Sequence, residues 1–378
     1  MDDKNKLDLK EQVNILKMAF KVIILLVIII AISPLVNSLG KASLYNLIFN
    51  GRLRLPFGEN SSLSYNLTLN NLDAMFASHI INGQEKRDDE YRIIVIGDSS
   101  TWGILLHPDQ TLPALIDKGL SLCQGKSVKV FNLGYPTLSL TKDVLIMAFA
   151  MEYEPDLVIW PLTLESFPLD KQTSNPLIEN NMDRIRSLNK KFGLITDLGE
   201  PPTNLERYLK NNLISKRKEY ADLIRLQFLG AMWSATGIDQ VYPGEYSKAK
   251  NDLDDSMEFH GFNSANDLEN NLAFYAIDNM KKIIGSTPII IINEPILVSD
   301  GLNHEIRYNF YYPIWAYDLY QTNLKTYLDE RGWNFLDLWD IVPRNEFTNS
   351  AIHLSPTGET IYSNEVINYI QESICYEK

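Results

Sequence analysis

A short apolar run that ends in a glycine constrains the fold of this chain more than any other feature. Residues 92–96 read Arg-Ile-Ile-Val-Ile, which is typical of a buried β-strand. The run continues into Gly97, Asp98, Ser99 and Ser100. Glycine permits a sharp turn at the C-terminal end of a strand, where open α/β sheets carry their reactive groups. A serine there can act as a nucleophile if a histidine reaches it, although an ordinary turn explains the tripeptide equally well.

Four further segments repeat the strand pattern, with helix-like segments between most of them. The strands are expected at 128–133, 156–160, 288–292 and 335–339. Apolar residues at helical spacing occupy 112–122, 141–153, 268–284 and 312–331. Strands that alternate with helices predict an α/β fold with a mostly parallel, doubly wound sheet.

Two other regions flank or interrupt this alternation. Residues 40–90 carry apolar side chains that need burial, which predicts a connector packed on the domain rather than a free linker. Residues 170–261 form an insertion with a helix expected from Asn204 toward Trp233. The apolar face of that helix favours an extra layer on the core, and a lid over the site or a surface on a membrane are the alternatives.

Composition excludes one class of partner. The formal net charge is −13 over 378 residues. Because nucleic-acid binding needs a basic surface, no nucleic-acid partner is expected. The two cysteines, Cys123 and Cys375, lack the spacing of a metal site or a redox motif. Two unpaired thiols are favoured over a single disulfide, and no metal or other cofactor is predicted.

An apolar segment near the N-terminus predicts insertion into a membrane. Residues 22–32 contain no charge, and extension to 18–39 gives the roughly 20 residues that a spanning helix needs. Lysines are more frequent before the segment than after it, which favours a cytoplasmic tail at 1–17. An uncleaved signal anchor is favoured over a cleaved signal peptide, and either would place the following domain outside the cytoplasm. A buried core helix is the minor alternative.

Two further motifs stand where a doubly wound sheet would carry functional residues. Residues 131–136 read Phe-Asn-Leu-Gly-Tyr-Pro at the end of the second strand. Gly134 allows a tight turn in which a backbone N–H could point at a developing oxyanion. His353 lies in a loop before a Ser-Pro pair and a helix expected over 359–370, which places it at the carboxyl edge of the sheet.

The order and position of these motifs resemble the SGNH/GDSL hydrolase superfamily over residues 91–378, apart from the insertion. The resemblance implies a flavodoxin-like α/β/α sandwich. It also implies that Ser99 is the nucleophile, that His353 is the general base, and that the Ser99 and Gly134 amides are oxyanion donors. The family includes esterases, lipases and carbohydrate O-acetyl hydrolases or transferases.

Two blocks depart from the family pattern. After the third expected strand, Thr163 stands where the family has a glycine, and Glu165 stands where it has an asparagine. An ionised carboxylate there would oppose the oxyanion, so Asn132 or the Thr163 hydroxyl would have to substitute as donor. The family's triad aspartate, three residues before the histidine, is replaced by Ser350, and Asn349 precedes it.

Other groups could orient the histidine in place of the missing aspartate. Asp337, Asp340 and Glu346 lie nearby in the sequence, although a solvated or helix-capping role is the simpler explanation for each. A backbone carbonyl could also do so. The loss matters because removal of the triad acid is a large penalty in serine proteases.

Together these features predict a membrane-anchored, extracytoplasmic serine esterase or O-acyltransferase. It would act on a small acyl group of an envelope or exported polysaccharide through a Ser99–His353 pair. Its expected partners are the membrane, the acylated polysaccharide or another small ester, and a membrane acyltransferase. One alternative is an inactive SGNH domain that binds glycan or scaffolds an envelope assembly complex, and another is a membrane-surface lipase.

Overall fold

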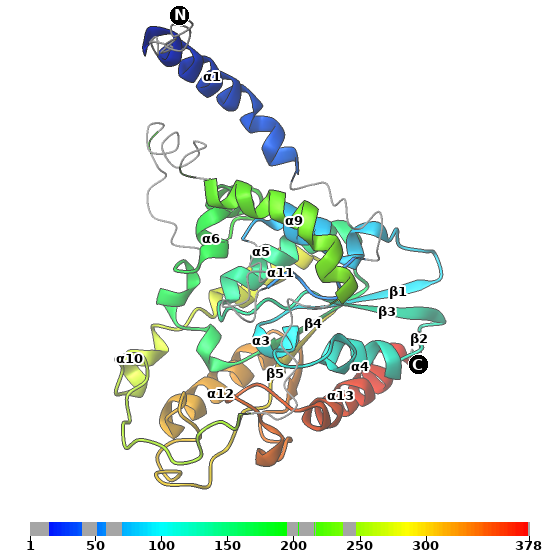
Figure 1. The fold of residues 1–378 in the computed structure, drawn as a ribbon. Coiled ribbons are helices and arrows are strands. Elements are labelled where there is room, and N and C mark those ends of the chain that lie inside the picture. The colour runs from blue at the N-terminus through cyan, green and yellow to red at the C-terminus, as the bar shows by residue number, and fades with distance from the viewer. Residues whose placement is uncertain are drawn as a thin grey trace, which may run out of the picture.

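A six-stranded β-sheet lies at the centre of the protein (Figure 1). The computed structural model describes residues 15–39, 51–57, 70–194, 203, 215, 217–236 and 247–376. The strands are β1 (Glu90–Val95), β2 (Leu122–Cys123), β3 (Lys126–Asn132), β4 (Leu157–Leu162), β5 (Ile289–Asn293) and β6 (Asn334–Asp337). Their order is β2-β3-β1-β4-β5-β6, and only β2 pairs antiparallel. The five parallel strands thus have the order of a flavodoxin-like sheet.

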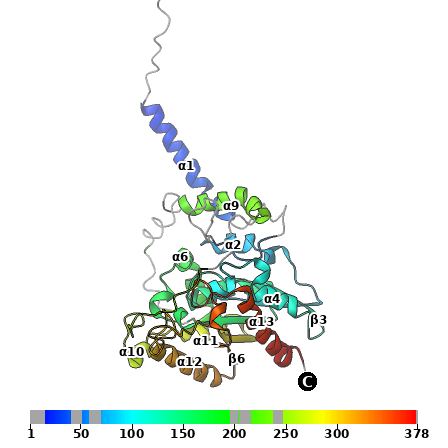
Figure 2. The same cartoon turned by 60° about the horizontal axis from the view of Figure 1, so that its bottom comes forward.

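Helices cover both faces of this sheet. They are α2 (Leu72–Ser78), α3 (Ser99–Trp102), α4 (Leu112–Gly119), α5 (Leu140–Ala150), α6 (Pro176–Asn180), α7 (Met182–Phe192), α9 (Arg217–Thr236), α10 (Ala265–Glu269), α11 (Tyr275–Ile284), α12 (Ile314–Asp329) and α13 (Pro356–Ile370). Helices α4 and α13 lie side by side on one face, whereas α5, α11 and α12 pack on the other (Figures 1 and 2). The arrangement is an α/β/α sandwich.

The pleat of the strands divides the core into two hydrophobic clusters. Ile94, Val158 and Ile291 belong to the cluster beneath α5, α11 and α12. Ile93 and Ile159, one residue away along the same strands, belong to the cluster beneath α4 and α13. Because successive side chains of a strand point to opposite faces, unbroken runs of apolar residues are needed wherever helices cover both faces.

The predicted strands are all present, and two local expectations need correction. The sequence pattern does not reveal β2, a strand of two residues paired with β3. The single helix expected at 268–284 is divided into α10 and α11. The break occurs because Leu169 donates to the Asn271 carbonyl and Ala273 donates to the Phe167 carbonyl, which draws this backbone out of the helix.

The insertion and the connector both pack on the core. In the insertion, Leu223 and Leu226 of α9 are buried in the first cluster, as expected for an extra layer. The start of the helix expected from Asn204 lies outside the described residues. In the connector, the Arg54 guanidinium donates to the Gly103 carbonyl at 2.7 Å, next to the end of α3.

The N-terminal apolar segment forms α1 (Ile15–Leu39), which extends away from the sheet (Figure 2). In the part of the chain that the structure describes, no helix reaches both the length and the apolar character that a membrane crossing demands. The predicted span at 18–39 is therefore not confirmed.

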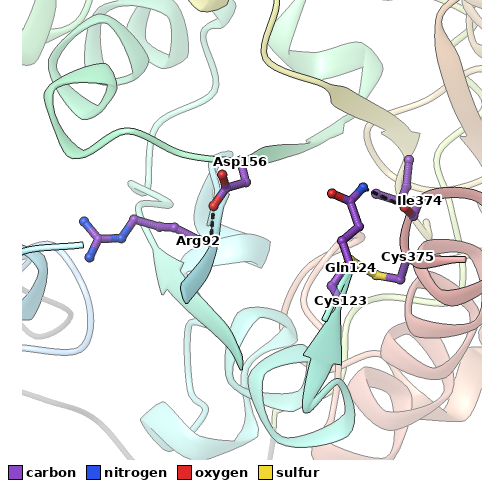
Figure 3. The surroundings of a disulfide bond; sticks show 6 residues. All are labelled: Arg92, Cys123, Gln124, Asp156, Ile374 and Cys375. Atoms are coloured by element: carbon purple, nitrogen blue, oxygen red, sulfur yellow. Dashed lines mark hydrogen bonds between the residues drawn. A yellow bond between two sulfur atoms is a disulfide. The ribbon is translucent and has the colours of Figure 1, made fainter. Parts of the chain in front are cut away.

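The expectation of two unpaired thiols is wrong. Cys123 of β2 and Cys375 form a disulfide, with an S–S distance of 2.00 Å and a Cα–Cα distance of 4.6 Å (Figure 3). Beside it, the Gln124 side chain donates to the Ile374 carbonyl at 3.1 Å. Because α13 packs along α4, it brings the C-terminal turn to the edge of the sheet. A separation of 252 residues gives no local signal of this pairing.

Candidate active site

The turn after β1 presents Ser99 at the first position of α3. Asp98 caps this short helix, because its side chain accepts a hydrogen bond from the Ser100 amide at 2.8 Å. The helix ends at Gly103, which adopts φ 87°, a conformation that glycine tolerates without a steric penalty. The predicted strand-turn-serine element is therefore a strand followed by a single capped helical turn, with Ser99 at the carboxyl edge of the sheet.

A closed loop brings His353 to the same place. The Thr348 amide donates to the His353 carbonyl at 2.8 Å, and the Ser355 amide donates to the Glu346 carbonyl at 2.7 Å. Ser355 then caps α13 through its hydroxyl. In this setting His353 Nε2 lies 2.8 Å from Ser99 Oγ. Two residues separated by 254 positions thus form a hydrogen-bonded serine–histidine pair.

Asn349 orients the imidazole. Its Oδ1 lies 2.8 Å from His353 Nδ1. An amide oxygen only accepts hydrogen bonds, so Nδ1 carries the proton and Nε2 is free to accept the Ser99 proton. Ser350, at the place of the family's aspartate, has no such contact among the described residues. The group that orients the histidine is therefore four residues before it, and it is neutral.

The nearby acids do not replace the triad aspartate. Asp337 accepts from Asn293 Nδ2 at 2.8 Å, and Glu346 accepts from the Ser355 hydroxyl. No hydrogen bond joins Asp337, Asp340 or Glu346 to His353 in the described structure. Burial lowers the pKa of His353 to about 4, so the imidazole is neutral near pH 7 and able to accept a proton.

The second-strand motif supports the nucleophile turn. Asn132 Nδ2 donates to the Thr101 carbonyl at 2.9 Å, and its Oδ1 accepts from the Gly134 amide at 3.0 Å. A Cβ on Gly134 would lie 2.6 Å from the Trp102 amide nitrogen, so only glycine fits against α3. In this geometry the Asn132 side chain is engaged within the protein. The oxyanion role of the Gly134 amide stays a prediction. It requires that the hydrogen bond from this amide to Asn132 Oδ1 be broken.

The residues after β4 form a separate polar group at the same edge. Thr163 Oγ1 lies 2.7 Å from the Tyr312 hydroxyl, which also accepts from the Glu165 amide at 3.3 Å. The Glu165 carboxylate pairs with the Lys171 ammonium and with His260 Nε2, the latter at 2.9 Å. Thr163 and Glu165 are buried, and the oxyanion or substrate-binding roles predicted for them stay predictions.

Sequence reasoning missed Lys142, which joins the two loops of the site. This fully buried lysine donates to the Gly97 carbonyl at 2.7 Å and to the Tyr135 carbonyl at 3.0 Å. Asp143 balances its charge at 2.5 Å. The only sequence signal is a Lys-Asp pair at the start of an otherwise apolar helix, α5.

Glu294 directly follows β5, and no sequence motif singles it out. The Ser100 hydroxyl donates to it, so it contacts the residue next to the proposed nucleophile. Burial and the nearby Asp98 raise the pKa of Glu294 well above its usual range. This shift favours the neutral form of the carboxyl and so lessens the negative charge beneath α3.

Comparison with known proteins gives structural matches only. No protein-family model matches the chain, and no curated protein matches it. A lipase/acylhydrolase from Enterococcus faecalis is similar at 14% identity and a TM-score of 0.39, covering 76% of this chain and 99% of that one. A lipolytic G-D-S-L family member from Veillonella parvula is similar at 10% identity and a TM-score of 0.36, covering 74% and 98%.

A carbohydrate acetylesterase family member from Sinorhizobium meliloti is also similar, at 12% identity and a TM-score of 0.34, covering 74% of this chain and 97% of that one. The chain is thus similar to GDSL/SGNH lipolytic proteins and esterases, in line with the resemblance seen in the sequence. All three TM-scores lie below 0.5.

Proposed function

We propose that the protein is a serine ester hydrolase or O-acyltransferase with Ser99 as nucleophile and His353 as general base. The 2.8 Å contact between Ser99 Oγ and His353 Nε2 carries this proposal. A nucleophile within hydrogen-bond reach of a base that a third group orients is the arrangement on which such catalysis depends. Asn349 is the orienting group.

The reaction would proceed through an acyl-enzyme. Ser99 Oγ attacks the carbonyl carbon of the ester while its proton passes to His353 Nε2. The bond to the leaving alcohol then breaks, and the leaving oxygen takes that proton. Water or an acceptor hydroxyl attacks the acyl group, and its proton returns to Ser99 through His353. The Ser99 amide, which has no hydrogen-bond partner among the described residues, is the first candidate oxyanion donor.

The substrate we propose is a small acyl group, such as acetyl, on an envelope or exported polysaccharide. The location we propose is outside the cytoplasm. The Cys123–Cys375 disulfide supports that location, because such bonds persist mainly in oxidising compartments. The polysaccharide rests on the family resemblance alone.

The test is turnover of p-nitrophenyl acetate by the full-length protein in mild detergent. Ser99→Ala and His353→Ala are expected to abolish it, whereas His304→Ala, which changes an exposed histidine, should not. A fluorophosphonate should label Ser99, and mass spectrometry of the labelled peptide separates Ser99 from Ser100. Equal turnover by all four proteins would refute the proposal.

Two observations favour a second candidate, an inactive domain that binds glycan or scaffolds an envelope assembly complex. Asn349 carries no charge, so it stabilises an imidazolium less than a carboxylate would, and Asn132 occupies the Gly134 amide. Absence of both turnover and labelling, together with glycan binding, would support this candidate. The lipase alternative would show itself as a preference for long-chain over acetyl p-nitrophenyl esters.

A further inference from the structure

The strand order places Glu165 beside the proposed nucleophile. In open α/β sheets, ligands bind outside the carboxyl ends of the strands, at the point where the strand order reverses. Here that point lies between β1 and β4, which are paired neighbours. Ser99 follows β1 and Glu165 follows β4. Groups held by Glu165 therefore stand at the edge where a substrate would meet Ser99.

Buried polar side chains lie between the two positions. The Tyr312 hydroxyl contacts both Thr163 and the Glu165 amide. Tyr312 also lies within the electrostatic influence of Glu294, which accepts from the Ser100 hydroxyl. The polar group after β4 thus interacts electrostatically, through Tyr312, with the carboxyl that contacts the residue next to Ser99.

A second histidine is fixed at this edge, and it has the carboxylate partner that His353 lacks. His260 Nε2 lies 2.9 Å from Glu165 Oε1, and Lys171 contacts the same carboxylate. The Glu165 side chain is 9% exposed and that of His260 is 26% exposed. His260 has φ 51°, which residues other than glycine rarely adopt, in a turn closed by paired backbone hydrogen bonds between Phe259 and Phe262.

The contacts of Glu165 fix the orientation of the His260 ring. Burial alone would raise the pKa of Glu165, but the hydrogen bond from His260 and the Lys171 ammonium outweigh it and lower the pKa. The carboxylate is therefore ionised, and His260 Nε2 donates its proton to it. In the neutral ring this leaves Nδ1 as a hydrogen-bond acceptor. Nδ1 has no protein partner within the described ranges.

We propose that His260, oriented by Glu165, binds a hydroxyl of a polyhydroxylated acyl acceptor such as a sugar. The inference rests on the proposed function, because it concerns the second half of that reaction. One acceptor hydroxyl donates to His260 Nδ1 and positions the molecule. A neighbouring hydroxyl attacks the acyl group on Ser99, forming the new ester bond as the bond to Ser99 Oγ breaks. Its proton passes to His353 and then to Ser99 Oγ.

The experiment compares two acceptors with the full-length protein in mild detergent. p-Nitrophenyl acetate is the acyl donor, and either methyl glucoside, a polyol, or methanol, a single hydroxyl, is the acceptor. Mass spectrometry and acetate release give the ratio of transfer to hydrolysis for each acceptor. Because both products come from one acyl-enzyme, this ratio reports only on the acceptor step. The unmodified protein should favour methyl glucoside per mole.

His260→Phe should lower the ratio for methyl glucoside about tenfold relative to the methanol ratio of the same variant, the upper range for one hydrogen bond. His260→Gln, which keeps an acceptor atom, should restore part of the loss. His304→Phe is the matched control, since His304 is exposed in another loop. Should His260→Phe not fold, Glu165→Gln gives the second measurement, with the same relative fall expected.

The outcomes separate this inference from the proposed function. Equal ratios for the two acceptors in the unmodified protein, or no relative change in the variants, would overturn the role of His260 while leaving the Ser99 acyl-enzyme intact. Absence of p-nitrophenolate release would overturn the proposed function and this inference with it. A relative fall with the His260 variant and not with the His304 variant supports the proposal.

Discussion

Glu359→Gln is expected to have a higher free energy of unfolding than the unmodified protein, and this difference should grow as the pH rises. Glu359 lies on α13 with its side chain directed toward the start of α4, and it is 2% exposed. Burial raises the pKa of this carboxyl to about 8, and the Leu112 backbone amide offsets the rise only in part. Its Oε2 has no hydrogen-bond partner among the described residues. The native protein therefore holds Glu359 protonated near neutral pH.

The free energy follows from the two pKa values. In the unfolded chain the carboxyl has its ordinary pKa of 4.5, whereas the folded value is about 8. Between them the unfolded chain binds fewer protons, so stability falls as the pH rises from 4.5 and levels off above the folded pKa. At about 1.36 kcal/mol per pH unit, the loss is about 3 kcal/mol at pH 7 and about 5 kcal/mol above pH 8.

Glutamine keeps the shape and an acceptor oxygen but does not titrate, so Glu359→Gln should remove this loss. Urea denaturation of the full-length protein, followed by tryptophan fluorescence at pH 5, 6, 7 and 8, measures it. Glu365→Gln, at an exposed acid on the same helix, is the control. The difference in unfolding free energy between Glu359→Gln and the unmodified protein should grow steadily with pH. A difference that stays constant from pH 5 to 8 would refute the reasoning.

Three further predictions concern the site and its surroundings. Asn349→Asp places a carboxylate beside His353 Nδ1, which favours the imidazolium. Turnover of p-nitrophenyl acetate should therefore rise at least about tenfold. The acid limb of the pH–rate profile, expected near pH 4 from the pKa of His353, should shift to higher pH. Gly134→Ala should displace α3, with a loss of about 1–3 kcal/mol in urea unfolding and of fluorophosphonate labelling; unchanged labelling would contradict it. Cys123→Ser should lower the unfolding free energy by about 2–5 kcal/mol under non-reducing conditions and by nothing once dithiothreitol is present.

The sheet was predictable because its signal is local. The central parallel strands β1, β4 and β5 are buried on both faces and are therefore rich in apolar residues, as in Ile289–Asn293 of β5. The same reasoning could not find β2, because a strand of two residues is too short to show a repeating pattern of apolar side chains. It could not divide the helix at 268–284 either, since the hydrogen bonds that interrupt it come from the segment after β4.

Within the candidate site, the proposed nucleophile and base are easier to find from the sequence than the residues that contact them. Ser99 and His353 stand in recognisable sequence contexts at the ends of elements. Asn349 was passed over because the family pattern pointed to the position three residues before the histidine, whereas the closed loop presents the residue four before it. Lys142 and Glu294 depend on contacts across 45 and 194 positions, which no local pattern encodes.

The sequence raises the problem that an ionised carboxylate near the oxyanion would oppose catalysis. Contacts that the sequence does not reveal bear on this problem. Glu165 is ionised, but Lys171 and His260 compensate its charge. Burial raises the pKa of Glu294 and so favours its neutral form, and burial lowers the pKa of His353 to about 4, so that its imidazole is neutral near pH 7. These three side chains thus add little uncompensated negative charge at the edge of the sheet. A neutral asparagine behind the histidine adds no charge to the resting site, and Asn349→Asp would exchange that neutrality for stronger stabilisation of the transient imidazolium.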